Sequence, residues 1–163
     1  MTDQRDTLAF DPGAATVNDR IANFNNIERT PNVPLIRKTL EHITAHPEEW
    51  DQTTWATERQ GCGTAFCFAG HVVNSEGHEI VWESGGECDC EWCGGTVSAE
   101  FCLVDGKPRT ISNVAMHALG LTRDQADTLF AGGNGLQVLY ALANEYTNGE
   151  IEIPADVKAR SGT

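Results

Sequence analysis

The chain has six cysteines, and their grouping constrains the fold more than any other feature of the sequence. One group is the pair Cys62 and Cys67. The other group lies within residues 88–102 and comprises Cys88, Cys90, Cys93 and Cys102. Glycine pairs at 85–86 and 94–95 border the three closest cysteines and let the loop turn tightly. Because four thiolates are a preferred ligand set for zinc, the sequence predicts a structural zinc site formed by this second group.

This zinc prediction leaves alternatives open. The Cys-x-Cys-x2-Cys spacing is less diagnostic than two Cys-x2-Cys pairs, and His78 could replace Cys102 as the fourth ligand. Disulfides within the loop and free thiols are the other interpretations. Neighbouring carboxylates favour the thiol over the thiolate, so without metal these cysteines are expected to be poor nucleophiles, and a bound cation would reverse that effect.

The charge of the chain is strongly negative and unevenly spread. Its formal net charge is −13 at pH 7, and no lysine or arginine lies between Arg59 and Lys107. The same interval holds eight carboxylates, at Glu76, Glu79, Glu83, Glu87, Asp89, Glu91, Glu100 and Asp105. This balance argues against direct binding to nucleic acid or to an anionic membrane. A solvated acidic face is the simplest interpretation, and a docking surface for a basic partner or a mimic of nucleic acid charge are the alternatives.

The length and the apolar content fit one soluble domain. A chain of 163 residues can bury a real core, and no apolar run approaches the roughly 20 residues that span a bilayer. The first residues show no secretory signal, so we expect a cytoplasmic location. Thiols stay reduced in that compartment, where clustered cysteines more often bind metal than form disulfides.

The hydrophobic pattern predicts a mainly α protein: a compact bundle of about five helices with a small two-stranded, cysteine-rich β excursion. We expect a polar arm over residues 1–31, one helical domain over 32–150, the excursion at 79–105 and a tail over 151–163. The first helix is expected to begin at Asn32 and to end before Pro47, with tryptophans 50 and 55 then covering the core. A second helix is expected to begin at Thr64.

The remaining elements have clear start and stop signals. Residues 80–82 and 96–104 are strand-like. Apolar stripes then predict three more helices, the first stopped by Gly120 and the second opened by a capping box at Thr122. The last stripe runs from Leu136 to Ala143. A helix-turn-helix interpretation of the Gly120 junction is disfavoured, since the following helix begins with few basic side chains.

Two further constellations could carry chemistry. Cys62 with His71 or His117 could form a thiol enzyme, although no orienting residue or oxyanion loop is evident. Close helix packing through small side chains explains the segment more simply. A metal ion or a disulfide shared by Cys62 and Cys67 is the remaining alternative. His42 and His46 are four residues apart at a helix end; a favourable interaction with that terminus is the simplest account, and a metal pair is the alternative.

One motif order resembles that of a known group of proteins. The order is Trp50, Trp55, then Cys62-Gly-Thr-x-x-Cys67-x-Ala-Gly, followed by Leu-Gly-Leu-Thr-x-x-Gln-Ala over 119–126 and Leu-Phe over 129–130. It resembles a group of small uncharacterised proteins of actinobacteria and their phages, over roughly residues 33–146. The resemblance implies one small helical domain and a phage origin, and it carries over no catalytic residue.

These features together favour a non-enzymatic, acidic module that binds another protein. A phage origin would make the partner a host factor with a basic surface or a neighbouring subunit of a virion or other assembly, and the location the host cytoplasm or the virion. The cysteine-dependent enzyme and the nucleic-acid charge mimic are the alternative functions.

Overall fold

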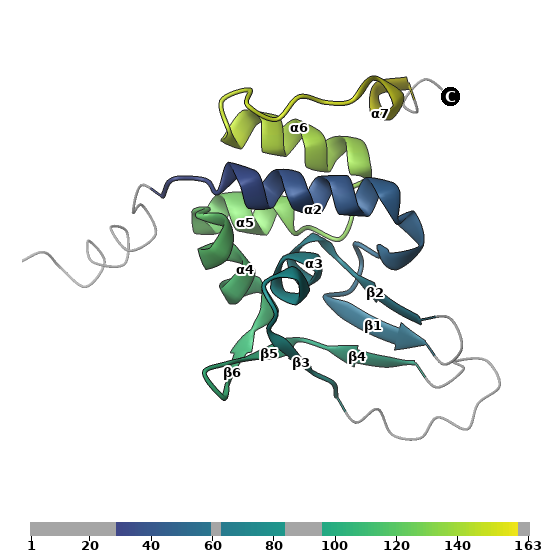
Figure 1. Ribbon diagram of the computed structural model, residues 1–163, viewed down its shortest axis with the longest axis vertical. Helices are drawn as coiled ribbons and strands as arrows, with labels where there is room; N and C mark the ends of the chain where they lie inside the picture. The colour runs from purple at the N-terminus through teal and green to yellow at the C-terminus, as the bar shows by residue number, and fades with distance from the viewer. Residues whose placement is uncertain (1–28, 60–62, 84–95, 160–163) are drawn as a thin grey trace, which may run out of the picture.

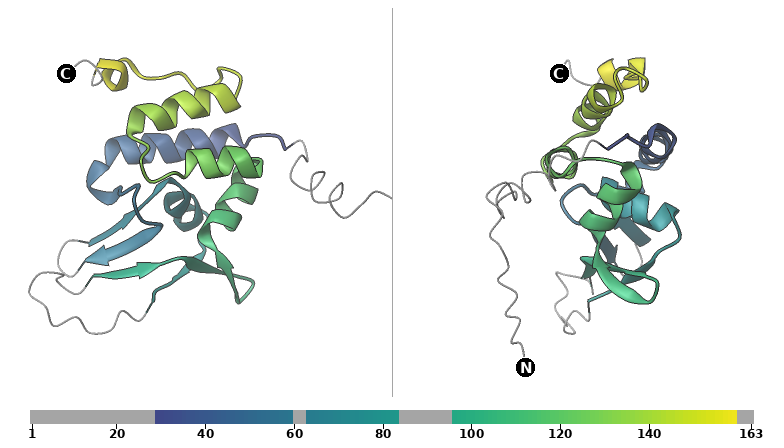
Figure 2. Two further views of the ribbon diagram at one scale, coloured as in Figure 1. Left: turned by 180° about the vertical axis from the view of Figure 1, so that it is seen from behind. Right: turned by 90° about the vertical axis from the view of Figure 1, so that its left-hand side faces the viewer.

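The computed structural model describes residues 29–59, 63–83 and 96–159 (Figure 1). These residues form six α-helices, one 3-10 helix and six strands in two antiparallel sheets. Helices α2, α5, α6 and α7 lie towards one end of the molecule and both sheets lie towards the other, with α3 and α4 between them (Figures 1 and 2). The prediction of a mainly α fold with a single two-stranded excursion is therefore wrong, because the protein is a mixed α/β structure.

Helix α2, Val33–Ala45, forms where its capping signals predict. The Asn32 side chain accepts a hydrogen bond from the backbone N–H of Leu35, and Pro34 lies in the first turn. The apolar side of α2 is fully buried at Ile36, Leu40 and Ile43. Pro47 then opens a short 3-10 helix, η1, Pro47–Glu49, which turns the chain back along the end of α2. The predicted first helix is confirmed.

The first sheet has the strand order β2-β1-β4 and consists of β1, Ala56–Arg59, β2, Gly63–Phe66, and β4, Val97–Ala99. Ala56 lies opposite Phe66 on one side and Ala99 on the other, and all three side chains are buried. The prediction that Thr64 begins a helix is wrong, because Thr64 pairs with β1. The helix begins four residues later, after the cap residue Cys67.

The second sheet has the order β3-β5-β6 and consists of β3, Glu79–Val81, β5, Phe101–Val104, and β6, Lys107–Thr110. Asp105 and Gly106 both have positive φ and make the tight turn between β5 and β6. The segment predicted as one strand over 96–104 is divided at Glu100, so that β4 joins the first sheet and β5 the second. The cysteine-rich loop between β3 and β4 lies outside the described residues.

Helix α3, Phe68–Ser75, is buried along nearly its whole length and packs against α2 and α4. Its first turn passes very close to the loop that carries Trp55, at Gly70. Trp50 and Trp55 are half-buried and pack against the core, which confirms that they cover it.

Three of the four C-terminal helices follow their predicted boundaries closely. These three are α4, Ile111–Leu119, α5, Arg123–Leu129, and α6, Leu136–Tyr146, and the fourth helix is α7, Ala155–Ala159. Gly120 has φ +64° and ends α4, and Thr122 with Gln125 forms the predicted capping box. Helix α7 was not predicted; it packs on α6 and buries Val157. Among the described residues, no helix is long and apolar enough to cross a membrane.

Candidate ligand-binding pocket

A pocket of about 570 Å³ opens between α4, the β5–β6 hairpin and the start of α5. Its apolar wall comes from α4 and the end of β5, at Val114, Met116, Ala118 and Val104. A volume on the order of 300–1,000 Å³ with mainly apolar walls and a few polar groups is typical of small-molecule sites.

Among the described residues, the polar groups around this pocket are cationic or neutral, and none is a carboxylate. Arg109 lies on β6, Arg123 begins α5, His117 lies on α4, and His78 precedes β3. Neither Arg109 nor Arg123 forms an ion pair with a carboxylate in the described part of the chain. In a protein with a net charge of −13, this leaves a local excess of positive charge.

Hydrogen bonds fix two of these side chains. Arg123 donates from Nη2 to Oδ1 of Asn113 at 3.0 Å. Arg29 donates from Nη1 to Nδ1 of His117 at 2.7 Å. Because a guanidinium can only donate, Nδ1 of His117 accepts, and the neutral ring carries its proton on Nε2, where it can donate to a ligand.

The surroundings of His117 keep its ring neutral. Partial burial lowers the pKa of His117, and the positive charges of Arg29 and then Arg123 lower it further. A bound anion would offset those two charges. The lowered pKa of His117 favours the neutral ring, which can donate a hydrogen bond from Nε2.

The C-terminal end of α4 does not repel an anion at this site. The last carbonyl groups of a helix normally carry partial negative charge. Here Leu121, Gly120 and the backbone of Asn32 donate to the carbonyls of Met116, His117 and Leu119, and the Asn32 amide donates to Ala118. The carbonyls of the last turn are therefore satisfied within the protein.

The predicted zinc ligands lie largely outside the described residues, since Cys88, Cys90 and Cys93 are in the loop between β3 and β4. Cys102 is described and fully buried in the middle of β5, between Ile80 and Arg109 of the neighbouring strands. Burial raises the pKa of the Cys102 thiol. The side chain belongs to the hydrophobic core, and the zinc site stays a prediction.

The structure does not test the thiol-enzyme alternative as a whole. Cys62 lies outside the described residues. The Cys67 thiol caps α3 by accepting from the Gly70 N–H, and burial raises its pKa to about 11. Burial and then the neighbouring His42 lower the pKa of His71 to about 4. Among the described residues, no hydrogen bond joins a cysteine thiol to a histidine.

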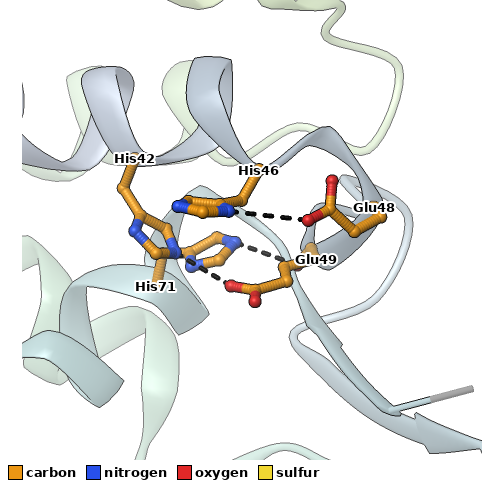
Figure 3. A network of polar contacts seen from close by, with 5 residues as sticks. All are labelled: His42, His46, Glu48, Glu49 and His71. Carbon is orange, nitrogen blue, oxygen red and sulfur yellow. Dashed lines mark hydrogen bonds and ion pairs between the residues drawn. The ribbon is translucent and has the colours of Figure 1, made fainter.

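A second polar cluster lies at the junction of α2 and η1, where His42, His46 and His71 meet Glu48 and Glu49 (Figure 3). In the sequence, only His42 and His46 were recognisable as a pair at this helix end. The Pro-Glu-Glu sequence at 47–49 turns two carboxylates back towards His42 and His46. It was the sequence signal that could have extended this pair to a larger cluster.

Comparison with known proteins adds no name to these sites. No protein-family model matches the chain, and neither the curated proteins nor the solved structures contain a significant match to it. The resemblance to small actinobacterial and phage proteins therefore stays an expectation.

Proposed function

We propose that the protein is a non-enzymatic binding module whose pocket beside α4 holds an organic anion, a carboxylate or phosphate attached to an apolar body. The observation that carries the proposal is the lining itself, in which the described residues supply two arginines and two histidines, and no carboxylate, around an apolar wall. The planar guanidinium groups of the arginines and the histidine N–H can bind a planar or tetrahedral oxyanion. The apolar wall can bind the apolar body of the ligand. The unpaired thiols of Cys67 and Cys102 fit a reducing compartment such as the cytoplasm.

The test is an NMR titration of the full chain with octanoate, octanol and inorganic phosphate. We expect octanoate to shift the methyl signals of Val114 and Ala118. It should also bind more tightly than octanol or phosphate, because only octanoate combines an anionic group with an apolar chain. Arg109→Gln and Arg123→Gln should each weaken binding about tenfold, as expected for one charge-assisted hydrogen bond.

The matched control is Arg37→Gln. Arg37 is exposed on α2 and donates to the carbonyl of Glu150, so this variant removes the same charge away from the pocket. Equal binding of octanoate and octanol, or equal weakening in all three arginine variants, would overturn the proposal.

A second candidate is the acidic protein-binding module expected from the sequence, and one surface favours it. The side of the second sheet opposite the buried Cys102 carries Phe101, which is 38% exposed, with Val81 and Leu103 half-buried beside it. Exposed Glu79 and Glu100 border these side chains. An apolar centre with an acidic rim suits a partner that presents an aromatic or aliphatic side chain among lysines and arginines.

This second candidate is tested with a labelled basic peptide that contains aromatic residues, using fluorescence anisotropy. Phe101→Ser should weaken binding, whereas Val138→Ser should not, because Val138 is the other exposed large apolar side chain and lies on α6. Equal affinity of both variants and the unchanged protein would remove Phe101 as the docking surface.

A further inference from the structure

The end of α2 and the 3-10 helix that follows it gather side chains that bind metals. His42 lies in the last turn of α2, His46 is the cap residue, and η1 carries Glu48 and Glu49. The His46 backbone N–H donates to the carbonyl of His42 at 2.8 Å and the Glu49 N–H donates to that of His46 at 3.1 Å. Backbone hydrogen bonds therefore fix the positions from which these four side chains project (Figure 3).

Three of the side chains converge on one point. One donor atom each of His46, Glu48 and Glu49 lies within 4.8 Å of the other two. Nδ1 of His46 is 3.5 Å from Oε1 of Glu48. Two donors of one tetrahedral zinc ion, each about 2.0–2.1 Å from the metal, are roughly 3.3 Å apart, so small side-chain rotations would complete the site.

Two more histidines hold Glu49 in place from the protein side. Nε2 of His42 lies 3.0 Å from Oε2 of Glu49. The buried His71, on α3, donates from Nε2 to the backbone carbonyl of Glu49 at 3.0 Å. Figure 3 shows both rings beside Glu49, and the ring centres of His42 and His71 are 5.1 Å apart. Contacts of this kind orient metal ligands in known sites.

The charge and exposure of the cluster also suit a cation. His46 and Glu48 are 48% and 69% exposed, so an ion can reach them without opening the core. The net charge of −13 favours any cation near the surface. Lys38, one turn before His42 on α2, is the positive side chain that shares a pocket with His42 and His71; it does not line the Glu48 side of the cluster.

We propose that His46, Glu48 and Glu49 bind one divalent transition-metal ion of the zinc class, with His42 and His71 as positioning residues for Glu49. Imidazole nitrogen and carboxylate oxygen are both zinc ligands, and three protein ligands leave a position open for water or another molecule. This site is separate from the predicted cysteine site and from the pocket beside α4, and it rests on neither.

The experiment is a Zn²⁺ titration of the full-length protein followed by NMR of the histidine ring nitrogens, which reports on each histidine separately and is not affected by zinc held by thiols alone. We expect the His46 ring signals to shift and saturate. Glu48→Gln should weaken the apparent affinity at the His46 signal at least tenfold, whereas Glu145→Gln, which removes an exposed carboxylate on α6, should leave it unchanged.

The role of His42 as a positioning residue has its own test. His42→Leu removes the donor to Glu49 and should weaken zinc binding about tenfold, while His42→Gln, whose amide can donate to the same carboxylate, should restore most of the affinity. His46 signals that do not move with zinc would overturn the proposal, even if His78 or the thiols respond. Equal zinc affinity of Glu48→Gln and Glu145→Gln would also overturn it.

Discussion

Gly70 is a position in the core that leaves no room for a side chain. A Cβ at this position would overlap with the backbone carbonyl oxygen of Trp55 and press against the Phe66 ring. A backbone oxygen cannot rotate away, so α3 or the Trp55 loop would have to move. The glycine in the Cys-x-Ala-Gly motif is therefore explained by the close approach of a helix to a loop, and it needs no catalytic explanation.

Gly70→Ala should lower the free energy of unfolding by about 1–3 kcal/mol, as expected for overpacking at a rigid position. Gly133→Ala is the matched control, because nothing lies within 4 Å of a Cβ there and the position has no positive φ. Chemical denaturation of both variants measures the difference. A Gly70→Ala protein as stable as the control would show that α3 can shift freely.

The buried thiol of Cys67 predicts that the free energy of unfolding depends on pH. Burial raises the pKa of its thiol from about 9 to about 11. The folded state thus keeps a proton that the unfolded state releases, so the stabilisation is complete below pH 9 and is lost as the pH rises through 11. Two pKa units correspond to about 3 kcal/mol.

The measurement is the free energy of unfolding at pH 8.5 and at pH 11 for the unchanged protein and for Cys67→Ser, whose hydroxyl can still cap α3. The unchanged protein should lose about 2 kcal/mol more than the variant across this range, because the folded-state thiol is still half protonated at pH 11. Identical losses in the two proteins would mean that the thiol is not held in a buried, protonated state.

Among the described elements, four of the six helices were predicted closely and half of the six strands were missed. Capping residues and apolar stripes mark α2, α4, α5 and α6 in the sequence, because these signals are local. Strands β1, β2 and β6 have four residues each and carry polar side chains, so their pairing depends on partners far along the chain.

The candidate sites were hidden from the sequence for the same reason. The pocket takes residues from His78 to Arg123, which no spacing connects, and Arg29 reaches it only through the fold. Four of the five residues of the polar cluster lie within residues 42–49, and two of these four, His42 and His46, were visible in the sequence as a pair. What the sequence could not supply was the turn of η1 that brings Glu48 to His46.

Gln52 joins elements that the sequence does not connect. Its side chain is buried; Oε1 accepts from the Trp50 indole and from the Phe68 backbone N–H at the start of α3. Its Nε2 donates to the carbonyls of Leu129 and Ala131 at the end of α5. One amide thus links α3, α5 and the tryptophan loop.

Gln52→Ala should lower the free energy of unfolding by about 2–3 kcal/mol, because it leaves buried donors and acceptors without partners. Gln137→Ala, on the exposed side of α6, should change it by less than about 0.5 kcal/mol. Thermal or chemical unfolding compares the two. Similar stabilities would show that water replaces the Gln52 hydrogen bonds without cost.

For the whole molecule, the structure extends the packed unit beyond the helical domain expected over residues 32–150. Ile151 and Val157 are each 3% exposed and belong to the same core as α2 and α6. The Ile151 backbone is held at both ends, since its N–H donates to the Thr147 hydroxyl and its carbonyl accepts from the Asn144 amide. The segment after Gly149 therefore contributes to the core.

Ile151→Ala should cost about 2–4 kcal/mol of unfolding free energy, the range for deleting a buried aliphatic side chain. Val157→Ala should cost less, because a valine loses fewer buried methyl groups and α7 is a single short helix at the chain end. Glu152→Ala, an exposed neighbour, is the control. If both apolar variants were as stable as that control, the C-terminal segment would detach from the rest of the core in solution. If only Ile151→Ala were destabilised, the boundary of the folded unit would lie between Ile151 and α7. A loss at both positions, in one cooperative transition, would place α7 within the same folding unit as α2 and α6.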